Sequence, residues 1–264
     1  MEESERVWAD DMPDAYDGWL ASPVFRPFAV DLAERASRQS ARSVLELAAG
    51  TGVLTRELMK FAGAEVVATD LNPPMVRRGA ANVPQARWLP ADAMHLPFGN
   101  GLFDLVVCQF GVMFLPDKPT GFAEARRVLA PGGAFLFNTW GPIAEHELES
   151  AVTAALRRLF PADPPTFLAT TPHGYADPER VVADVRAGGF TEVDLATVVL
   201  EGRAESAADV ASGYCLGTPL RAAIQQRGDL PSVRAALTAA LAAEFGSGPL
   251  TWRMSAHAVT ASAV

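Results

Sequence analysis

Short apolar runs alternate with amphipathic stretches through the first half of the chain. Four apolar runs between turn signals are typical of buried strands, and they occupy residues 44–47, 65–70, 103–108 and 134–137. Apolar residues at helical spacing predict helices over residues 12–20, 25–40 and 53–61. Strands that alternate with helices predict an α/β fold with a doubly wound, mostly parallel sheet and helices on both faces.

The second half of the chain continues this pattern but contains two helical insertions. The first follows the 134–137 strand and holds an expected helix at residues 145–160 and a proline-rich loop. Asp177 and Pro178 predict a helix start, and Gly188 and Gly189 predict its end. Strands are expected at residues 191–199 and 254–262, and the alanine-rich stretch between them predicts the second insertion.

Candidate chemistry begins where the first strand ends. Gly50 and Gly52 permit a tight turn and remove the Cβ atoms that would hold a ligand away from the backbone. Asp70 ends the second strand, about 20 residues later, at the spacing where an acid meets a ribose hydroxyl. The pattern is compatible with a dinucleotide site or an S-adenosylmethionine site. Thr55 stands where a dinucleotide fingerprint needs a third glycine, and Glu46 would repel a pyrophosphate but suits an ammonium or sulfonium cation.

Taken together, these segments resemble the class I S-adenosylmethionine-dependent methyltransferases. The resemblance covers roughly residues 44–199 and is closest to the quinone-biosynthesis and small-molecule branch. Its motifs are the Glu46-x-Ala48-x-Gly50-x-Gly52 loop, Asp70, Asp92 with Ala93, the strand at residues 103–108, and the Pro131-Gly132-Gly133 turn before the next strand. Ala48 departs from the glycine that many members carry, which narrows the loop slightly.

The resemblance implies S-adenosylmethionine as cofactor, S-adenosylhomocysteine as product, and direct in-line transfer of a methyl group to a small-molecule acceptor. The cofactor-binding residues it implies are Glu46, Ala48, Gly50, Gly52, Asp70, Leu71, Met75, Asp92, Ala93 and Gln109. It places Ala48, Gly50 and Gly52 near the methionyl part, Asp70 at the ribose, Asp92 at the adenine and Gln109 beside the methyl group. Candidates for the substrate pocket are Phe110, Met113, Trp140, Tyr175 and Tyr214.

The expected fold is therefore a Rossmann-like, seven-stranded, mostly parallel sheet in one methyltransferase domain spanning residues 1–264. N-terminal helices are expected within residues 1–42, and the resemblance places such a segment over the cofactor. The cofactor-binding core is expected at residues 43–140, with lid insertions at 141–175 and 204–250. Residues 176–200 and 251–264 complete the core. Both insertions start or finish near the carboxyl edge of the sheet, where ligands of open α/β sheets bind.

The sequence leaves the catalytic residues unknown. His146 and His173 lie in the first insertion and are candidate bases, although each is also interpretable as an ordinary surface histidine. Two other functions remain open. One is a catalytically silent protein of the same fold that binds S-adenosylmethionine, and the other is a nicotinamide oxidoreductase, which Glu46 and Thr55 disfavour.

The composition of the chain excludes some classes of binding partner. A formal net charge of −9 argues against nucleic acid, because phosphate contacts need clustered lysine and arginine. The two cysteines and four histidines show no ligand spacing, so no metal is expected. The N-terminus is acidic and no apolar run approaches the ~20 residues of a membrane span, so a cytoplasmic location without membrane insertion is expected. The sequence does not decide whether the protein forms a homodimer.

Overall fold

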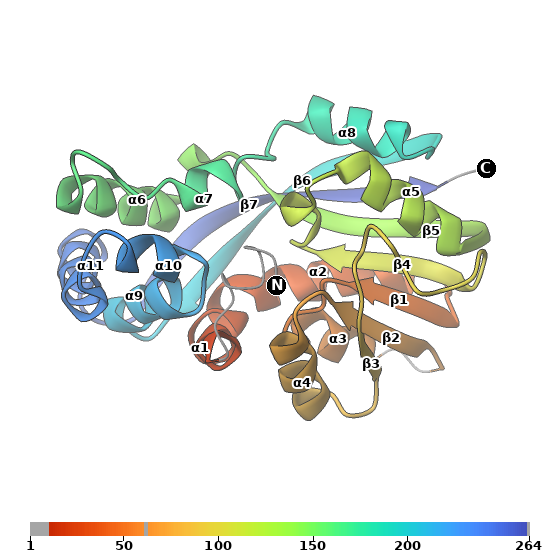
Figure 1. Cartoon of the computed structure of the whole chain (residues 1–264), viewed down its shortest axis with the longest axis horizontal. Coiled ribbons are helices and arrows are strands. Elements are labelled where there is room, and N and C mark those ends of the chain that lie inside the picture. The colour runs from red at the N-terminus through yellow and green to blue at the C-terminus, as the bar shows by residue number, and fades with distance from the viewer. Residues whose placement is uncertain (1–10, 61–62, 263–264) are drawn as a thin grey trace.

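A seven-stranded sheet forms the centre of the molecule in the computed structural model, which describes residues 11–60 and 63–262 (Figure 1). The strand order is β3-β2-β1-β4-β5-β7-β6, and all strands are parallel except β7. The strands are β1 (Ser43–Leu47), β2 (Glu65–Asp70), β3 (Arg87–Pro90), β4 (Phe103–Gln109), β5 (Leu129–Trp140), β6 (Glu192–Ala204) and β7 (Leu250–Ser262). The expected α/β fold is confirmed, and the order reverses beside β1, where such sheets bind ligands.

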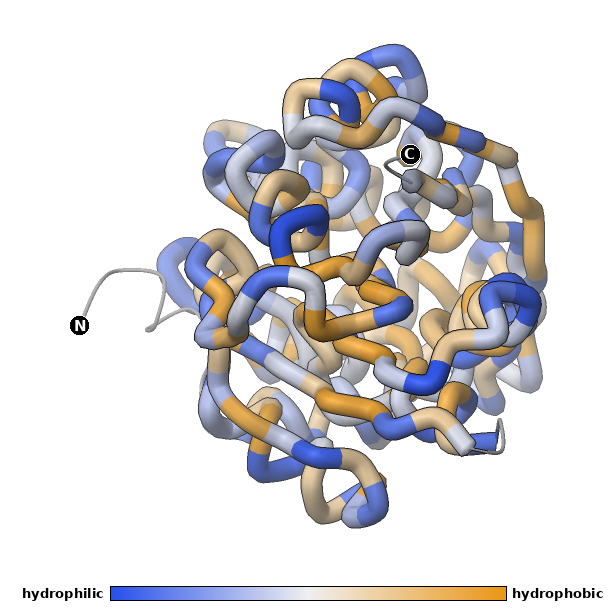
Figure 2. The backbone as a smooth tube through the Cα atoms, turned by 90° about the vertical axis from the view of Figure 1, so that its right-hand side faces the viewer, coloured by the Kyte–Doolittle hydropathy of each residue, from blue (hydrophilic) through white to orange (hydrophobic). Residues whose placement is uncertain are grey.

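Helices cover both faces of this sheet. On one face lie α2 (Arg26–Ser37), α3 (Val53–Leu58) and α4 (Pro73–Asn82), while α5 (Lys118–Val128) and α8 (Pro178–Ala187) pack together on the other (Figure 1). The N-terminal α1 (Met12–Trp19) joins α2 through one π-helical turn, η1 (Ala21–Phe25). Figure 2 shows the apolar strands running through the middle of the molecule between more hydrophilic outer helices.

Beyond the carboxyl edge of the sheet, β6 and β7 continue as a long antiparallel ribbon. Its pairing extends from Val199 opposite Ser255 to Ala204 opposite Leu250, past the end of β5 at Trp140. The ribbon carries the insertion helices, which form a separate layer in Figure 1. These are α6 (Glu147–Leu159), α7 (Phe167–Thr170), α9 (Ala207–Leu216), α10 (Leu220–Gln225) and α11 (Leu230–Phe245), with the short turns η2 (Val112–Phe114) and η3 (Ile143–Glu145) nearby.

The insertions share a hydrophobic core with the sheet. One continuous cluster runs from Phe122 of α5 and Phe137 of β5 to Leu156 and Leu237 of the insertion helices. A second cluster packs α2 and α3 against the opposite face. The insertion helices therefore pack into the same hydrophobic core as the sheet.

Several element ends differ from the sequence expectation. β6 ends at Ala204 and β7 starts at Leu250, because the two strands pair with each other beyond the sheet, which no local pattern reveals. The expected Pro-Gly-Gly turn lies inside β5 as a bulge, marked by a register shift between Phe103 and Leu105 and by φ +78° at Gly132. α3 ends at Leu58, and the expected end at Phe61 lies outside the described residues. The capped start of α8 at Asp177 is confirmed.

Gly111 allows the loops that follow β1 and β4 to approach each other. A Cβ atom there would lie 2.4 Å from the Ala48 Cβ and 2.7 Å from the Cys108 Sγ. These atoms belong to short side chains at the ends of the central strands, so they cannot turn away.

We predict that Gly111→Ala lowers the free energy of unfolding by about 1–3 kcal/mol, the usual cost of overpacking. Gly18→Ala is the matched control, since that glycine lies in α1 and a Cβ atom added there would meet nothing within 4 Å. It should leave stability unchanged or raise it by up to about 1 kcal/mol, because alanine favours a helix over glycine. Urea unfolding of both variants checks this, and equal effects would contradict the close approach.

Candidate functional site

The glycine loop after β1 is held by the carboxylate of Asp70. Its Oδ2 accepts the Gly50 N–H at 2.8 Å, and its Oδ1 accepts the Asn72 N–H at 2.8 Å. Burial raises the pKa of Asp70, and these two hydrogen bonds oppose that rise. Ala48, Gly50 and Gly52 have φ values of +51°, +56° and +89°, so the loop curls back on itself. A Cβ at Gly50 would meet nothing within 4 Å, which leaves open space above the loop.

Glu46 lies beneath the loop and is almost fully buried, with 1% exposure. Its Oε2 accepts the Thr55 hydroxyl at 2.6 Å, and its backbone carbonyl accepts the Thr69 hydroxyl at 2.8 Å. Burial raises the pKa of Glu46 to about 8, assisted by the negative charge of Asp70 and opposed by the Thr55 hydrogen bond. Thr55, which replaces the third glycine of a dinucleotide loop, thus serves to fix this acid.

The opposite side of the site is more open. Leu71 follows Asp70 and is 64% exposed, the largest value among the exposed large apolar side chains of residues 11–60 and 63–262. Asp92 faces the same edge, since the Ala91 N–H donates to the Asp70 carbonyl at 3.0 Å. Asp92 accepts the Met94 N–H at 2.8 Å, and its Oδ2 lies 3.1 Å from the Nδ1 of His95. Met75, by contrast, is buried.

The N-terminal helix α1 is clamped over the glycine loop by Asp17. Thr51 donates its hydroxyl to Asp17 at 3.1 Å, and Asn82 donates both to Asp17 at 3.1 Å and to the Thr51 carbonyl at 2.9 Å. Arg78 pairs with Asp17 at 3.0 Å and with Asp14 at 3.1 Å. This contact places α1 beside the glycine loop, and the expectation that an N-terminal segment lies over the cofactor stays a prediction. The sequence does not single out Asp17, because nothing local in an amphipathic helix shows which acid meets a loop 34 residues away.

Aromatic rings close the far end of the site. Phe110 and Trp140 stack at 3.6 Å between centroids and 11° between planes, and both contact Phe25 and Phe28. Gln109 donates its Nε2 hydrogen to the Phe25 carbonyl at 2.8 Å, which ties η1 to the end of β4. We call Phe25, Phe28, Phe110 and Trp140 the aromatic wall.

Tyr16 continues this wall toward the glycine loop. Its ring stacks on Phe25 at 4.8 Å between centroids. Burial raises the pKa of its hydroxyl, and the carboxylates of Asp70 and Asp17 raise it further, so the ring lies between the wall and the acids. The sequence does not single out Tyr16, Phe25 and Phe28 as site residues, because each has the pattern of an ordinary apolar position in a helix.

The five substrate-pocket candidates do not all come together. Met113 joins the wall, because its Sδ accepts the Trp140 N–H at 3.4 Å. Tyr175 instead donates its hydroxyl to Asp184 of α8 at 2.9 Å, with Lys118 over its ring. Tyr214 donates its hydroxyl to Glu149 of α6. Phe110, Met113 and Trp140 thus form one group, while Tyr175 anchors α8 and Tyr214 belongs to the insertion layer.

The interpretation of His146 and His173 as surface histidines is wrong, because their exposures are 0% and 8%. Their ring centroids lie 4.4 Å apart, and Trp140 packs against both rings. Burial and the neighbouring His146 lower the pKa of His173 to about 4. The two residues meet because the ribbon brings α6 and the 161–175 loop onto the end of β5.

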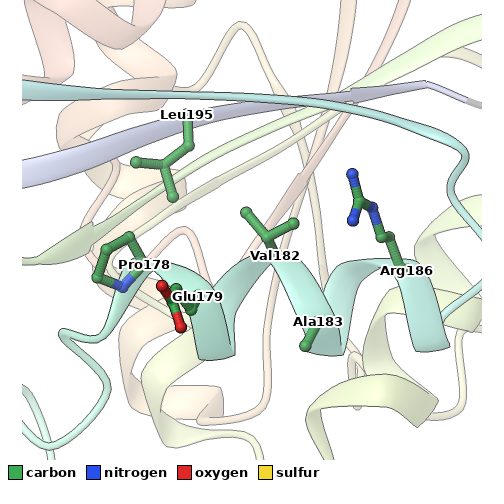
Figure 3. A pocket seen from close by; sticks show the side chains of 6 residues that line it. All are labelled: Pro178, Glu179, Val182, Ala183, Arg186 and Leu195. Atoms are coloured by element: carbon green, nitrogen blue, oxygen red, sulfur yellow. The ribbon is translucent and has the colours of Figure 1, made fainter.

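Two surface depressions lie away from these residues. One is a groove between α8 and β6, lined by Pro178, Val182 and Leu195 among others (Figure 3). Another lies at the amino ends of the strands, between Ala36 and Val66. Neither contains a candidate site residue, so the functional hypothesis rests on the carboxyl edge of the sheet.

The residues at the carboxyl edge fit an S-adenosylmethionine molecule. The space above Gly50 admits a ligand backbone, the remaining lone pairs of Asp70 suit ribose hydroxyls, and the exposed face of Leu71 suits an adenine ring. Glu46 lies at the end of β1 as a buried acid, and its raised pKa favours the neutral form in the ligand-free protein. The stacked rings of Phe110 and Trp140 give the end of β4 an apolar surface.

Comparison with known proteins agrees with this geometry. The family described as "Methyltransferase domain" matches residues 45–137. A malonyl-[acyl-carrier protein] O-methyltransferase from Halorhodospira halophila is 43% identical over 114 residues, which cover 42% of this chain and 39% of that protein. A demethylmenaquinone methyltransferase from Mycolicibacterium vanbaalenii is 33% identical over 160 residues, covering 57% of this chain and 68% of that protein.

The fold is shared with solved methyltransferase structures. A phosphoethanolamine N-methyltransferase from Haemonchus contortus, solved with S-adenosylhomocysteine, superposes with a TM-score of 0.61 at 14% identity, over 97% of this chain and 60% of that one. The chain belongs to the class I S-adenosylmethionine-dependent methyltransferases, whose cofactor is S-adenosylmethionine. It spans well under two thirds of the Halorhodospira protein. No helix within residues 11–60 and 63–262 has the length and apolar character to cross a membrane.

We predict that Glu46 makes the ligand-free protein less stable as pH rises. Its folded-state pKa of about 8 lies above the ordinary value of 4.5, so the folded state binds the extra proton and loses this advantage between those two values. The slope should approach, at most, about 1.4 kcal/mol per pH unit. Glu46→Gln should flatten it while keeping an oxygen for Thr55, as urea unfolding across the mildly acidic to mildly basic range would show. An unchanged slope in the variant contradicts the assignment.

We also predict that Asp17→Ala loosens α1. It removes an acceptor shared by Thr51, Arg78 and Asn82, so unfolding free energy should fall by about 1–3 kcal/mol. Asp14→Ala is the control on the same helix, since Asp14 is 72% exposed and its pair with Arg78 should contribute at most about 1 kcal/mol. Equal losses in both variants, measured by urea unfolding, would show that no clamp exists.

Proposed function

We propose that this protein transfers the methyl group of S-adenosylmethionine to a small-molecule acceptor by direct in-line displacement. The observation that carries the proposal is the joint placement of the glycine loop, Asp70 and Asp92 along one edge of the sheet, with the Asp70 carboxylate bonded to the Gly50 N–H. Glu46, Ala48, Gly50 and Gly52 would hold the methionyl end. Asp70 would bind the ribose, while Leu71, Met75, Asp92 and Ala93 would hold the adenine, and Gln109 would lie beside the methyl group.

The acceptor proposed for this site is a neutral or aromatic molecule. Phe110, Met113 and Trp140 supply an apolar surface next to the end of β4, and such surfaces favour flat apolar ligands. The name of the Mycolicibacterium relative, a demethylmenaquinone methyltransferase, points the same way. The Halorhodospira relative is named for an acyl-carrier-protein substrate, so acyl acceptors form the second class to test.

In such a reaction the protein would align the acceptor with the methyl group and exclude water from the site. Bound S-adenosylmethionine supplies an electrophilic methyl carbon: the acceptor forms a bond to that carbon, the carbon–sulfur bond breaks, and its electron pair stays on sulfur. The acceptor's proton leaves to solvent or to a base. Gln109 and the aromatic wall would orient the acceptor at the end of β4, and α1, tied to the glycine loop by Asp17, would help to exclude water.

Methyl transfer can be tested with isotope-labelled S-adenosylmethionine and two acceptor panels, one of quinols and phenols and one of acyl thioesters. We expect labelled product from the first panel together with S-adenosylhomocysteine. Tight cofactor binding without turnover on either panel would favour the alternative, a protein of the same fold that only binds S-adenosylmethionine.

Asp70→Ala should weaken S-adenosylmethionine binding by about 1.5–3 kcal/mol, because hydrogen bonds to a charged group are lost. Asp104→Ala is the control: that carboxylate also accepts backbone N–H groups, from Arg42 and Ser43, but at the opposite edge of the sheet. Calorimetric titration separates the two variants. Unchanged affinity in Asp70→Ala, or an equal loss in Asp104→Ala, overturns the ribose assignment.

A further inference from the structure

A buried polar cluster lies under the insertion helices and contacts Trp140. Its members are His146, Glu149 and His173, whose exposures are 0%, 3% and 8%. One nitrogen or oxygen atom from each lies within 4.8 Å of those of the other two. Among the described residues, these three form the one group of three or more His, Cys, Asp or Glu side chains whose spacing could hold a metal ion.

Backbone carbonyls fix the orientation of both imidazole rings. The Nε2 of His146 lies 2.9 Å from the Ser255 carbonyl, and the Nδ1 of His173 lies 2.9 Å from the Gly141 carbonyl. A carbonyl can only accept, so each of these nitrogens carries the hydrogen. The Ser255 N–H also lies 3.3 Å from the His146 Nε2, but that contact is the longer of the two. When both rings are neutral, their lone pairs are therefore on the His146 Nδ1 and the His173 Nε2.

The third member is held in a similar way. Tyr214 donates its hydroxyl to one carboxylate oxygen of Glu149, Oε1, and leaves Oε2 free. Metal-binding histidines commonly donate their other N–H to a backbone carbonyl, and metal-binding carboxylates are themselves hydrogen-bonded. The outer contacts of His146, His173 and Glu149 follow this arrangement.

Two of the inward-facing atoms have no partner. The His146 Nδ1 and the Glu149 Oε2 are both buried and make no hydrogen bond. They lie 3.7 Å apart, which is too long for a hydrogen bond but within ion-pair distance if His146 carries a second proton. Two such buried atoms facing each other are costly unless a cation, either a metal ion or that proton, lies between them.

From this geometry we propose that His146, Glu149 and His173 bind one divalent transition-metal ion of the zinc type. Two imidazole nitrogens and one carboxylate form a recurrent three-ligand set for zinc, which leaves a fourth position for another ligand. Nitrogen donors disfavour Mg²⁺, which takes oxygen ligands. Trp140 contacts both histidine rings and stacks on Phe110, so the ion would lie directly behind the aromatic wall. The proposal does not depend on methyl transfer.

The test uses the untagged full chain, stripped with a chelator and titrated with Zn²⁺, Mg²⁺ and Co²⁺. We expect one equivalent of Zn²⁺, no binding of Mg²⁺, and a Co²⁺ absorption spectrum of mixed nitrogen and oxygen ligation. His146→Ala and His173→Ala should each weaken Zn²⁺ binding by more than the roughly 10- to 100-fold that loss of an outer partner costs. Glu149→Gln should do the same while keeping the side-chain volume and the Tyr214 contact.

The matched control is His257→Ala. His257 is also buried, at 5% exposure, but both of its nitrogens have partners, Thr197 at 3.2 Å and the Ala176 carbonyl at 2.9 Å. It should bind Zn²⁺ as the unmodified protein does. Absence of a Zn²⁺ equivalent in the unmodified protein overturns the proposal, and so does retention of that equivalent in Glu149→Gln. If the alanine variants do not fold, a Zn²⁺-dependent rise in the melting temperature of the unmodified protein, absent in Glu149→Gln, supports the proposal.

Discussion

The contact on which this site depends is the pair of hydrogen bonds at the Asp70 carboxylate. It joins the loop after β1, through Gly50, to the turn after β2, through Asn72. These strands are neighbours in a parallel sheet, so their carboxyl ends meet at one edge. The Asp70 carboxylate therefore holds the glycine loop in shape and still has lone pairs that can accept hydrogen bonds from a ligand. Its raised pKa shows the cost of burying this charge, which the two N–H groups offset in part.

The remainder of the site closes around that edge. Asp17 fastens α1 over the glycine loop, and Gln109 fastens the π-helical turn through the Phe25 carbonyl. Both contacts join an N-terminal segment to loops that surround the proposed cofactor. Asp17 also joins α1 to α4 through Arg78 and Asn82, and α1 packs against α9 of the insertion layer. The insertion helices share the buried core of the sheet.

Much of this arrangement can be predicted from the sequence, because the information is local. The glycine turn, the acid 20 residues later and the capped start of α8 each depend on a few consecutive residues. The alternation of elements predicts a mostly parallel sheet, whereas the count of seven strands comes from the family resemblance, because β3 is too short to show a strand pattern. Contacts between distant segments cannot be predicted in the same way. Asp17, Tyr16 and Phe25 look like ordinary positions of amphipathic helices. His146 and His173 look like surface residues until the long β6 and β7 ribbon places the insertion against β5.

The most direct measurement is a calorimetric titration of the purified protein with S-adenosylhomocysteine, followed by NADH. S-adenosylhomocysteine carries the adenine, ribose and amino-acid groups that we propose for Asp92, Asp70 and Glu46, but not the transferable methyl group. We expect one equivalent to bind with micromolar affinity, and no heat from NADH, because the loop lacks the third glycine of a pyrophosphate-binding loop. Binding of NADH without binding of S-adenosylhomocysteine would contradict the assignment of this edge to S-adenosylmethionine.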